Sequence, residues 1–411
     1  MTSNTRVVVI GAGLAGVRLA RRLGELGTPV TLVGDEEHRP YNRVLLAEVL
    51  AGRYAPEVIA LPAPAGIVRA RVTGIDRAAR AVDCADGTRI AYDMLVLATG
   101  SNPVLPPLRG LFTPDHVLPE GVHAFRTMDD CLGLSKAVRP GVRAVVIGGG
   151  LLGVSAARAL AVRGAKVVLA QQAERLMERQ LDPAASKLVL RHLKDLGVEV
   201  HTECRVRDVR CVGGAVRSVE LADGYVLDTD LVVVACGVRP RAGLALDAGL
   251  AVHQGVLVDD ELRTSDPRIH AIGDCVQHAG TVYGLAAPAV EQAEALAELI
   301  AGDSDSRYTG TRSLTRLTLA GSGTPSDASA AFDLAAFGET EARPGDDVVQ
   351  LADATRGTYR KVVVRDDRLV GGVLVGELGT VGALARAWEG AEPLPSDGGP
   401  LLHLLTNDGG S

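Results

Sequence analysis

The sequence predicts an α/β protein in which one strand–turn–helix–strand plan is used twice. Residues 6–37 align without gaps on residues 143–174, and 16 of these 32 positions are identical. The same offset of 137 places the segment DMLVLATGSNP (93–103) on DLVVVACGVRP (230–240). Two matches in one register indicate two copies of a supersecondary unit, each the start of a parallel sheet.

The first copy opens with apolar β-formers and continues into a Gly-x-Gly-x-x-Gly turn formed by Gly11, Gly13 and Gly16. The first glycine allows the tight turn, the second lets a pyrophosphate approach the backbone, and the third lets the helix pack on the strand. The helix that follows offers N–H groups and a positive dipole end to phosphates. Asp35 and Glu36, near the end of the second strand, suit the hydroxyls of an adenosine ribose.

The second copy has the same turn but lacks the acid. Its glycines are Gly148, Gly150 and Gly153. Gln171 and Gln172 stand where an acidic residue is expected, a change that either admits a 2′-phosphate, with Arg175 as its ligand, or weakens nucleotide binding. Arg175 can equally be a solvated or structural arginine. We also expect the nucleotides to meet the residues inside the two turns, which are Leu14, Ala15, Leu151 and Leu152.

Composition and charge exclude several other classes of protein. The formal net charge is −7, from 43 basic and 50 acidic residues, which argues against a nucleic-acid binder. No apolar run approaches the roughly 20 residues of a membrane span, and no signal peptide is expected. The six cysteines form no Cys-x-x-Cys pair, so we expect reduced thiols in a cytoplasmic protein and no metal site.

With these motifs, the chain resembles the two-dinucleotide flavoproteins of the pyridine nucleotide-disulfide reductase superfamily. The segment TSDPRIHAIGDCVQ (264–277) resembles the second FAD motif of that family. LATG (97–100) and VACG, which ends at Gly237, resemble its connector motifs. The resemblance covers about residues 6–310. It implies a Rossmann-like FAD domain with a Rossmann-like NAD(P) domain inserted in it.

The resemblance assigns further residues to the flavin. Asp274, after Gly273, would meet the ribityl chain, and Arg126 would approach FAD. Glu291 would open a helix after AAPAV, and the N-terminus of that helix would face the flavin and stabilise negative charge on the reduced ring. Arg126, Glu291 and the segment Tyr41 to Arg43 can instead be ordinary loop or surface residues. Other positions that match the family's FAD contacts are Tyr41, Asn42, Arg43, Ala98, Thr99 and Gly100.

Three segments resemble one branch of the superfamily more closely. They are HRPYNRVLLAEVLAG (38–52), LMERQLDPAA (176–185) and YRKVVVRDDRLVGGVLVGE (359–377). They are similar to the FAD/NAD(P) part of the assimilatory nitrite reductase large subunit, to electron-transfer subunits of nitrate assimilation, and to rubredoxin and ferredoxin reductases. In nitrite reductase an iron–sulfur and siroheme region follows. No cysteine cluster follows Cys275, so we expect only the electron-input module.

The chain departs from the family pattern at three positions, two in the nucleotide half and one, Glu48, that the resemblance implies faces it. Glu48 stands where many relatives have a lysine, and Ser155 stands where many have a glutamate. With Gln171, this makes three departures, whereas the flavin half is intact. The sequence therefore predicts FAD binding more firmly than efficient use of NADH or NADPH.

The domain prediction follows from the repeat and the resemblance. An FAD-binding domain is predicted at 1–115 and 241–308, an NAD(P)-binding domain at 116–240, and a small C-terminal α/β interface domain at 309–405. In this last domain we expect a β-hairpin around Asp366-Asp367 and a helix with Trp388. In the family it closes over the flavin or forms a homodimer interface. A polar loop is expected at 321–331, and the tail from Ser396 is expected to fray.

No catalytic acid–base set is assigned, because a flavin carries the chemistry itself. The leading prediction is an FAD-dependent NAD(P)H oxidoreductase, in which hydride passes from nicotinamide C4 to flavin N5. Electrons would then pass to a ferredoxin, a rubredoxin, a nitrate or nitrite reductase component, a small molecule or O2. Two alternatives stay open. One is an FAD-binding redox-responsive or assembly protein with a weakened nucleotide site, and the other is an FAD-dependent oxidase of an organic substrate.

Overall fold

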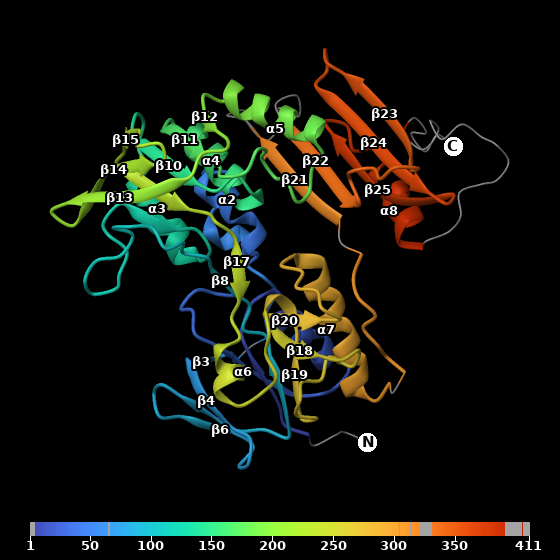
Figure 1. Cartoon of the computed structure of the whole chain (residues 1–411). Coiled ribbons are helices and arrows are strands. Elements are labelled where there is room, and N and C mark those ends of the chain that lie inside the picture. Colours follow the sequence, from blue (N-terminus) through green and yellow to red (C-terminus); the bar gives the residue numbers. More distant parts are fainter. Residues whose placement is uncertain are drawn as a thin grey trace. The chain divides into compact units, whose positions relative to one another are not determined.

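The computed structural model describes residues 5–64, 66–303, 305–312, 314–320, 331–390 and 405 (Figure 1). Apart from Ala331 and Leu405, the predicted polar loop and C-terminal tail lie outside the described residues. The chain forms two compact units. The first consists of Met1–Leu46, Tyr54–Val104 and Val238–Thr311, and the second of Ala47–Arg53, Leu105–Gly237 and Arg312–Ser411. The three-domain boundaries given above stay a prediction.

The first unit is built on a five-stranded parallel sheet in the order β19-β7-β1-β2-β3. All four side chains of β1 are buried, as expected for a central strand covered on both faces. Helix α1 buries Val17, Leu19 and Leu23 in the same core as Leu296 of α7. The elements of this layer are β1 (Val7–Ile10), α1 (Leu14–Glu25), β2 (Val30–Gly34), β3 (Val68–Arg69), β7 (Met94–Leu97), β19 (Ile269–Ala271) and α7 (Ala286–Ala301).

Shorter elements complete the first unit. An antiparallel sheet β4-β5-β6 and two strand pairs, β17-β8 and β18-β20, lie outside the main sheet. The strands are β4 (Val72–Asp76), β5 (Ala81–Cys84), β6 (Arg89–Ala91), β8 (Ser101–Pro103), β17 (Val238–Pro240), β18 (Val256–Val258) and β20 (Val276–His278). The short helices are η1 (Arg43–Leu45), η2 (Pro56–Ile59), α6 (Gly243–Asp247) and η3 (Gly273–Cys275); α2 (Leu46–Leu50) begins here and continues into the second unit.

The second unit repeats the parallel sheet, now in the order β12-β11-β10-β16-β9. Helix α4 is apolar on most of its surface and buries seven consecutive residues from Val154 to Leu160. The elements are β9 (Val122–Ala124), α3 (Met128–Ala137), β10 (Arg143–Ile147), α4 (Leu151–Val162), β11 (Lys166–Ala170), α5 (Pro183–Asp195), β12 (Glu199–His201) and β16 (Leu231–Val234). The predicted α/β class with Rossmann-like parallel cores is confirmed.

Two antiparallel sheets belong to the same unit. One is β13-β14-β15, and the other is the C-terminal sheet β21-β22-β25-β24-β23, followed by α8. Asp366 and Asp367 join β24 to β25 with φ values of +49° and +55°, as a type I′ hairpin turn requires, so the predicted hairpin is confirmed. The elements are β13 (Val206–Val212), β14 (Ala215–Leu221), β15 (Val226–Asp228), β21 (Leu314–Ala320), β22 (Ala331–Gly338), β23 (Asp347–Asp353), β24 (Thr358–Arg365), β25 (Arg368–Val375) and α8 (Val381–Gly390), which contains Trp388 as predicted.

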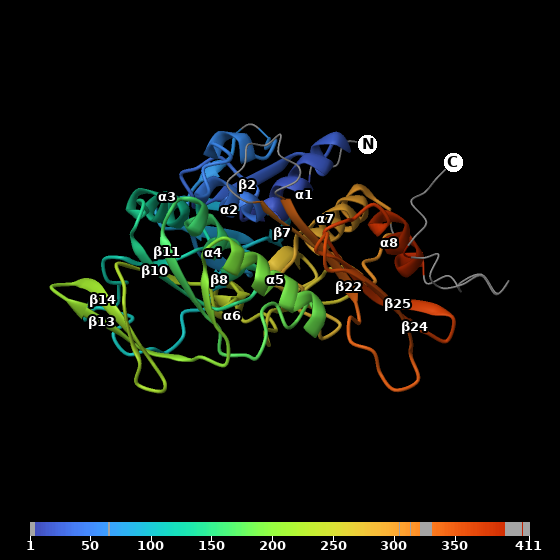
Figure 2. The ribbon, with the colours of Figure 1, turned by 90° about the horizontal axis from the view of Figure 1, so that it is seen from above.

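Helix α5 lies beside the C-terminal sheet (Figure 2), and a buried polar cluster connects the two. Asp182, the N-cap of α5, accepts hydrogen bonds from Tyr359 Oη at 2.6 Å and from Lys361 Nζ at 3.0 Å. Farther along α5, the imidazole of His192 stacks on the ring of Phe332 at a centroid distance of 4.6 Å. These hydrogen bonds and the charge of Lys361 offset the cost of burying the Asp182 carboxylate. The cluster therefore fixes where the sheet meets the helix.

One buried and two partly buried histidines make the fold sensitive to acid. Burial lowers the pKa of His123, His192 and His270 below the ordinary value of about 6.5. The unfolded chain therefore binds more protons than the folded chain below pH 6.5, and stability falls as the pH drops through this range. We expect His192→Phe, which keeps the stacked ring, to reduce this pH dependence in thermal melts at pH 7.5 and 5.5. An unchanged pH dependence would contradict this interpretation.

Candidate dinucleotide-binding sites

The first glycine turn lies at the carboxyl edge of its parallel sheet. Strands β1, β2, β7 and β19 are all parallel, so the residues that follow them meet at one edge. These residues are Gly11, Asp35, Ala98 and Gly273, all predicted from the sequence. In open α/β sheets ligands bind in the crevice outside this edge.

The three glycines of this turn have different structural roles. Gly11 has φ +114°, and a Cβ there would lie 2.1 Å from the carbonyl oxygen of Ala98. A Cβ on Gly16 would lie 1.9 Å from the carbonyl oxygen of Gly11. By contrast, nothing lies within 4 Å of the position that a Cβ on Gly13 would take. The outer glycines therefore hold the turn together, and the middle one faces open space.

The start of helix α1 suits an anion. Gly13 is its N-cap, with no side chain bonded to the cap, and the first turn contains no acidic residue. The backbone N–H groups and the positive end of the helix dipole thus meet no carboxylate from the first turn of α1 itself. The residues present fit the pyrophosphate of a dinucleotide, with Leu14 and Ala15 in the first turn.

The second predicted FAD motif reaches the same edge. Gly273 has φ +79°, and a Cβ there would lie 3.0 Å from Cβ of Ala15 on α1. Ser101 Oγ donates a hydrogen bond to Asp274 Oδ2 at 2.9 Å, and Gln292 Oε1 accepts one from Gly273 N at 2.7 Å. The close approach of Gly273 to Ala15 therefore brings the second FAD motif to the first glycine turn, and Ser101 is a partner of Asp274 that sequence reasoning missed.

Removing the side-chain amide of Gln292 should weaken this site. Gln292 is buried, and its Oε1 accepts the hydrogen bond of the Gly273 N–H. The isosteric variant Gln292→Met would leave that N–H without this acceptor, at a cost of about 1–3 kcal/mol. We expect a lower melting temperature and a weaker hold on the flavin, measured as the free FAD released on dilution. The neighbouring variant Glu291→Gln is the control; equal losses in both variants would contradict this role.

A second cluster in the first unit joins Glu36, Tyr41 and Arg43. Tyr41 Oη donates to Glu36 Oε2 at 2.7 Å, Arg43 Nη1 donates to Tyr41 Oη at 2.9 Å, and Arg43 also pairs with Glu36. Burial alone would lower the pKa of the Arg43 guanidinium, but Tyr41, Glu36 and Asp274 outweigh it and the net shift is upward. Arg43 therefore lies within electrostatic reach of two of the predicted FAD acids, Glu36 and Asp274.

The remaining predicted residues of this unit have mostly local roles. Asn42 Oδ1 accepts from Val44 N at 3.1 Å and caps η1. Thr99 Oγ1 donates to the carbonyl oxygen of Arg241 at 2.7 Å, while Gly100 takes φ +74°. The Asp35 carboxylate makes only long ion pairs, the shorter with Arg71 Nε at 3.6 Å. Of the two acids after β2, Asp35 thus has weaker interactions with protein partners than Glu36 has.

The prediction that Glu291 opens a helix is wrong. Helix α7 begins at Ala286, so the segment AAPAV forms its first turn. Pro288 is compatible with the first turn, because the N–H it lacks has no intrahelical acceptor there. Glu291 lies in the second turn, where Oε2 accepts from Thr311 Oγ1 at 2.6 Å.

The second glycine turn reproduces the first. Gly148 has φ +109°, and a Cβ there would lie 2.5 Å from the carbonyl oxygen of Ala235. A Cβ on Gly153 would lie 1.8 Å from the carbonyl oxygen of Gly148. Gly150 is again open, and it caps α4 without a side-chain bond or an acid in the first turn, which contains Leu151 and Leu152. The segment Ala235 to Gly237 and Arg126 follow β16 and β9 at the same edge. The assignment of Arg126 to FAD stays a prediction.

The two turns differ at the strand end that faces the glycine loop. In the first, Ala12 lies against Gly34, where an added Cβ would approach Cβ of Ala12 to 2.7 Å. In the second, the repeat places Gly149 at the position of Ala12 and Gln171 at the position of Gly34. The smaller residue of the pair is therefore in the glycine turn, and the larger one is at the strand end. Gln171 is 9% exposed; its Oε1 accepts from Gly149 N at 2.8 Å, and its Nε2 donates to the Arg175 carbonyl oxygen at 3.3 Å. Both ends of the amide therefore have protein partners.

The other departures from the family pattern also have protein partners. Ser155 Oγ donates to the Leu151 carbonyl oxygen at 2.8 Å within α4. Glu48 forms an ion pair with Arg158, whose side chain is completely buried in α4. Arg175 Nη1 donates to Glu341 Oε1 at 2.8 Å.

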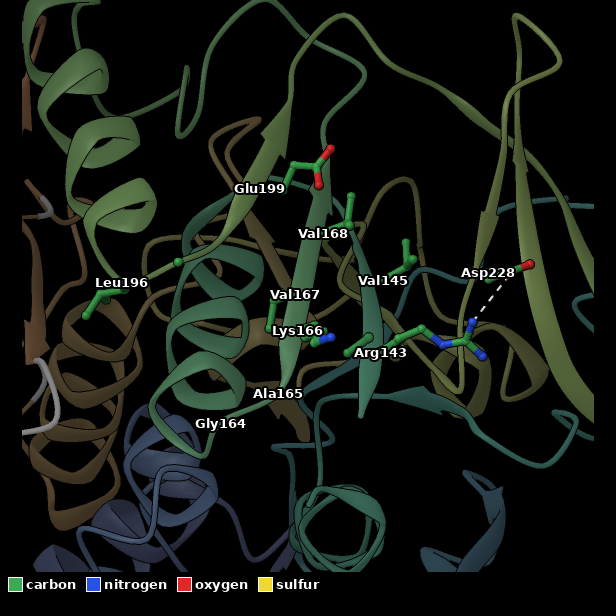
Figure 3. A pocket seen from close by; sticks show the side chains of 12 residues that line it. Arg143, Val145, Gly164, Ala165, Lys166, Val167, Val168, Leu196, Glu199 and Asp228 are labelled. Carbon is green, nitrogen blue, oxygen red and sulfur yellow. Dashed lines mark ion pairs between the residues drawn. The ribbon is translucent and has the colours of Figure 1, made fainter. Parts of the chain in front are cut away.

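A cavity of about 380 Å³ lies at the opposite edge of the second sheet (Figure 3). It is lined by the first residues of β10 and β11 and by the turn before β12, and Arg143 pairs with Asp228 at 3.3 Å beside it. Because the glycine turn follows the carboxyl end of β10, this cavity is separate from the dinucleotide crevice. Within the described residues, no helix is long and apolar enough to cross a membrane, and no group of three or more His, Cys, Asp or Glu side chains could hold a metal ion.

Comparison with known proteins assigns the chain. Residues 5–293 match the family model "Pyridine nucleotide-disulphide oxidoreductase", and residues 330–389 match "Rubredoxin NAD+ reductase C-terminal domain". The assimilatory nitrate reductase electron transfer subunit of Bacillus subtilis is 33% identical, over 90% of this chain and 48% of its own length. The rubredoxin-NAD(+) reductase of Pseudomonas putida is 32% identical, over 72% of this chain and 80% of its own.

Solved structures agree with the sequence comparison. The putidaredoxin reductase–putidaredoxin complex is similar with a TM-score of 0.83 and 25% identity, covering 99% of this chain and 100% of that one. The chain spans about half the length, or less, of the nitrate and nitrite reductase relatives that it matches. Two Rossmann-like cores, two complete glycine turns and a family match over more than half of the sequence lead to one conclusion: the chain belongs to the pyridine nucleotide-disulphide oxidoreductase family.

Proposed function

We propose that the chain is an FAD-dependent NAD(P)H oxidoreductase that passes electrons to an external acceptor. One observation carries the proposal: both glycine turns keep an open middle glycine and a helix start free of acidic residues. Each is a built site for a pyrophosphate, and the chain has two of them. Relatives named as an electron transfer subunit and as rubredoxin and ferredoxin reductases support the same reading.

The residues divide between the two cofactors as follows. The first turn, Asp35 and Asp274 would hold FAD, with Arg43 near the acids. The second turn would hold NADH or NADPH, with Gln171 and Arg175 beside the adenosine. FAD bound in this way would supply the ability to take up hydride and to give up electrons, which no side chain has. The chain's own contribution is to bind, to orient and to neutralise charge.

The acceptor that we propose is a small redox protein, such as a ferredoxin or rubredoxin, or a component of nitrate or nitrite reduction. The test uses the purified chain loaded with FAD and NADH. Candidate acceptors are added one at a time, and their reduction is followed by their own absorbance. Reduction of a redox protein much faster than that of O2 supports the proposal. Rapid H2O2 formation with every acceptor left oxidised would contradict it and favour an oxidase. We also propose a cytoplasmic location and a homodimer, the latter to be tested by light scattering.

One observation favours a second function. Both ends of the Gln171 amide and the Ser155 hydroxyl have partners inside the protein, so part of their hydrogen-bonding capacity is already used. This arrangement fits a redox-responsive or assembly protein that keeps FAD but turns over nicotinamide nucleotides slowly. Flavin reduction by NADH or NADPH within seconds would exclude it.

A further inference from the structure

A residue from a connection between two strands of the C-terminal sheet reaches the loop that follows β11 in the same unit. Glu341, in the connection between β22 and β23, pairs with Arg175, which lies four residues beyond Gln171. The side chain of Arg175 is 24% exposed and that of Glu341 is 59% exposed. In this fold an arginine near the end of the second strand is the group that accepts a 2′-phosphate.

The position of Glu341 is fixed by buried contacts. The carbonyl oxygen of the preceding residue, Thr340, accepts from Lys361 Nζ at 2.9 Å, and Lys361 also pairs with Asp182 at the start of α5. Lys361 and Asp182 are both buried. On the other side, the Arg175 backbone is held by the Gln171 amide. Glu341 and Arg175 are thus brought together by two anchored segments.

The charges of Arg175 and Glu341 bear on the choice between NADH and NADPH. Gln171 and Gln172, which align with Gly34 and Asp35 of the first copy, are neutral, so these two residues neither favour a ribose hydroxyl through a carboxylate nor repel a phosphate. Arg175 would attract a 2′-phosphate, but Glu341 already neutralises it and would repel the dianion.

We propose that Glu341 sets the coenzyme preference of this site by holding Arg175 and excluding the 2′-phosphate of NADPH. The chain therefore prefers NADH, and the discriminating acid comes from the C-terminal sheet instead of the strand end. This inference rests on the proposed nicotinamide nucleotide site. The variant Glu341→Gln should convert the site towards NADPH.

The experiment is a calorimetric titration of the FAD-loaded chain with adenosine 2′,5′-bisphosphate, and with 5′-AMP as the ligand without the 2′-phosphate. Because one exposed pair is broken and one repulsive charge is removed, Glu341→Gln should bind the bisphosphate about 3- to 10-fold more tightly, with 5′-AMP unchanged. The control Glu377→Gln removes an equal charge just after β25, where Glu377 pairs with Arg360 instead, and should change nothing. Adding Arg175→Gln to Glu341→Gln should abolish the gain.

Three results would overturn the inference: equal affinities in the wild type and Glu341→Gln, a gain that persists without Arg175, or no bisphosphate binding in either. Flavin reduction is read separately. A wild type whose flavin neither nucleotide reduces would contradict the proposed function, whereas a wild type reduced equally well by NADH and NADPH would contradict the role of Glu341 alone.

Discussion

Replacing Gly150 with valine should leave FAD bound but slow the reduction of the flavin by NADH and NADPH by about 100-fold or more. Gly150 has φ −78° and ψ −176°, which any residue adopts, and nothing lies within 4 Å of its Cβ position. The variant should therefore fold. The new side chain would stand where the pyrophosphate approaches α4, and losing one or two charge-assisted hydrogen bonds costs roughly 3 kcal/mol.

Two further glycine variants show whether slower flavin reduction in Gly150→Val comes from lost nucleotide binding or from misfolding. Gly13→Val makes the same change at the first turn, where φ is −81°, and should yield a protein that loses FAD. Gly11→Ala puts a methyl group at φ +114° and 2.1 Å from a carbonyl oxygen, so it should impair folding itself. Circular dichroism separates folding from binding. If Gly150→Val is reduced as fast as the wild type, the second turn is not the nucleotide site.

Breaking the ion pair between Glu48 and Arg158 should destabilise the second unit by about 3–5 kcal/mol. The Arg158 side chain is 0% exposed, and burial lowers the pKa of its guanidinium even though Glu48 opposes this shift. In Glu48→Gln the buried cation would lose its carboxylate. Glu48 lies in 47–53, the short segment that the first part of the chain contributes to the second unit. The measurement is urea unfolding followed by circular dichroism.

The double variant Glu48→Leu/Arg158→Met is the control for this pair. It removes both charges and fills the space with apolar side chains, a change that is often neutral. We expect it to recover most of the stability lost in Glu48→Gln. Glu25→Gln, at an exposed pair on α1, should cost less than about 1 kcal/mol. If Glu48→Gln costs no more than Glu25→Gln, the pair does not stabilise the unit.

The parts of the molecule that could be predicted from the sequence depend on short-range patterns. The repeat, the two glycine turns and the hairpin at Asp366-Asp367 are each specified within a few residues by conformations that only certain residues adopt. Residues next to these turns, such as Asp35 and Ala98, then follow from the parallel order of the strands.

The parts that could not be predicted depend on partners far away in the sequence. Gln292 bonds to Gly273, Glu48 pairs with Arg158, and Glu341 pairs with Arg175, and no local pattern relates the members of these pairs. One long-range pair could have been predicted. The repeat aligns Ala12 with Gly149 and Gly34 with Gln171, so the contact between Ala12 and Gly34 in the first copy points to one between Gly149 and Gln171 in the second. Comparing the copies position by position could have shown it. The start of α7 at Ala286 has no local signal of this kind, because its N-cap, Leu285, has no side chain that could cap the helix.

The central claim is that the chain binds FAD and reduces it with a nicotinamide nucleotide. Anaerobic stopped-flow mixing of the purified protein with NADH, and separately with NADPH, tests it most directly through the visible flavin absorbance. We predict bleaching within seconds by NADH and slower bleaching by NADPH. A flavin that stays oxidised with both nucleotides, yet is reduced by dithionite, would contradict the claim.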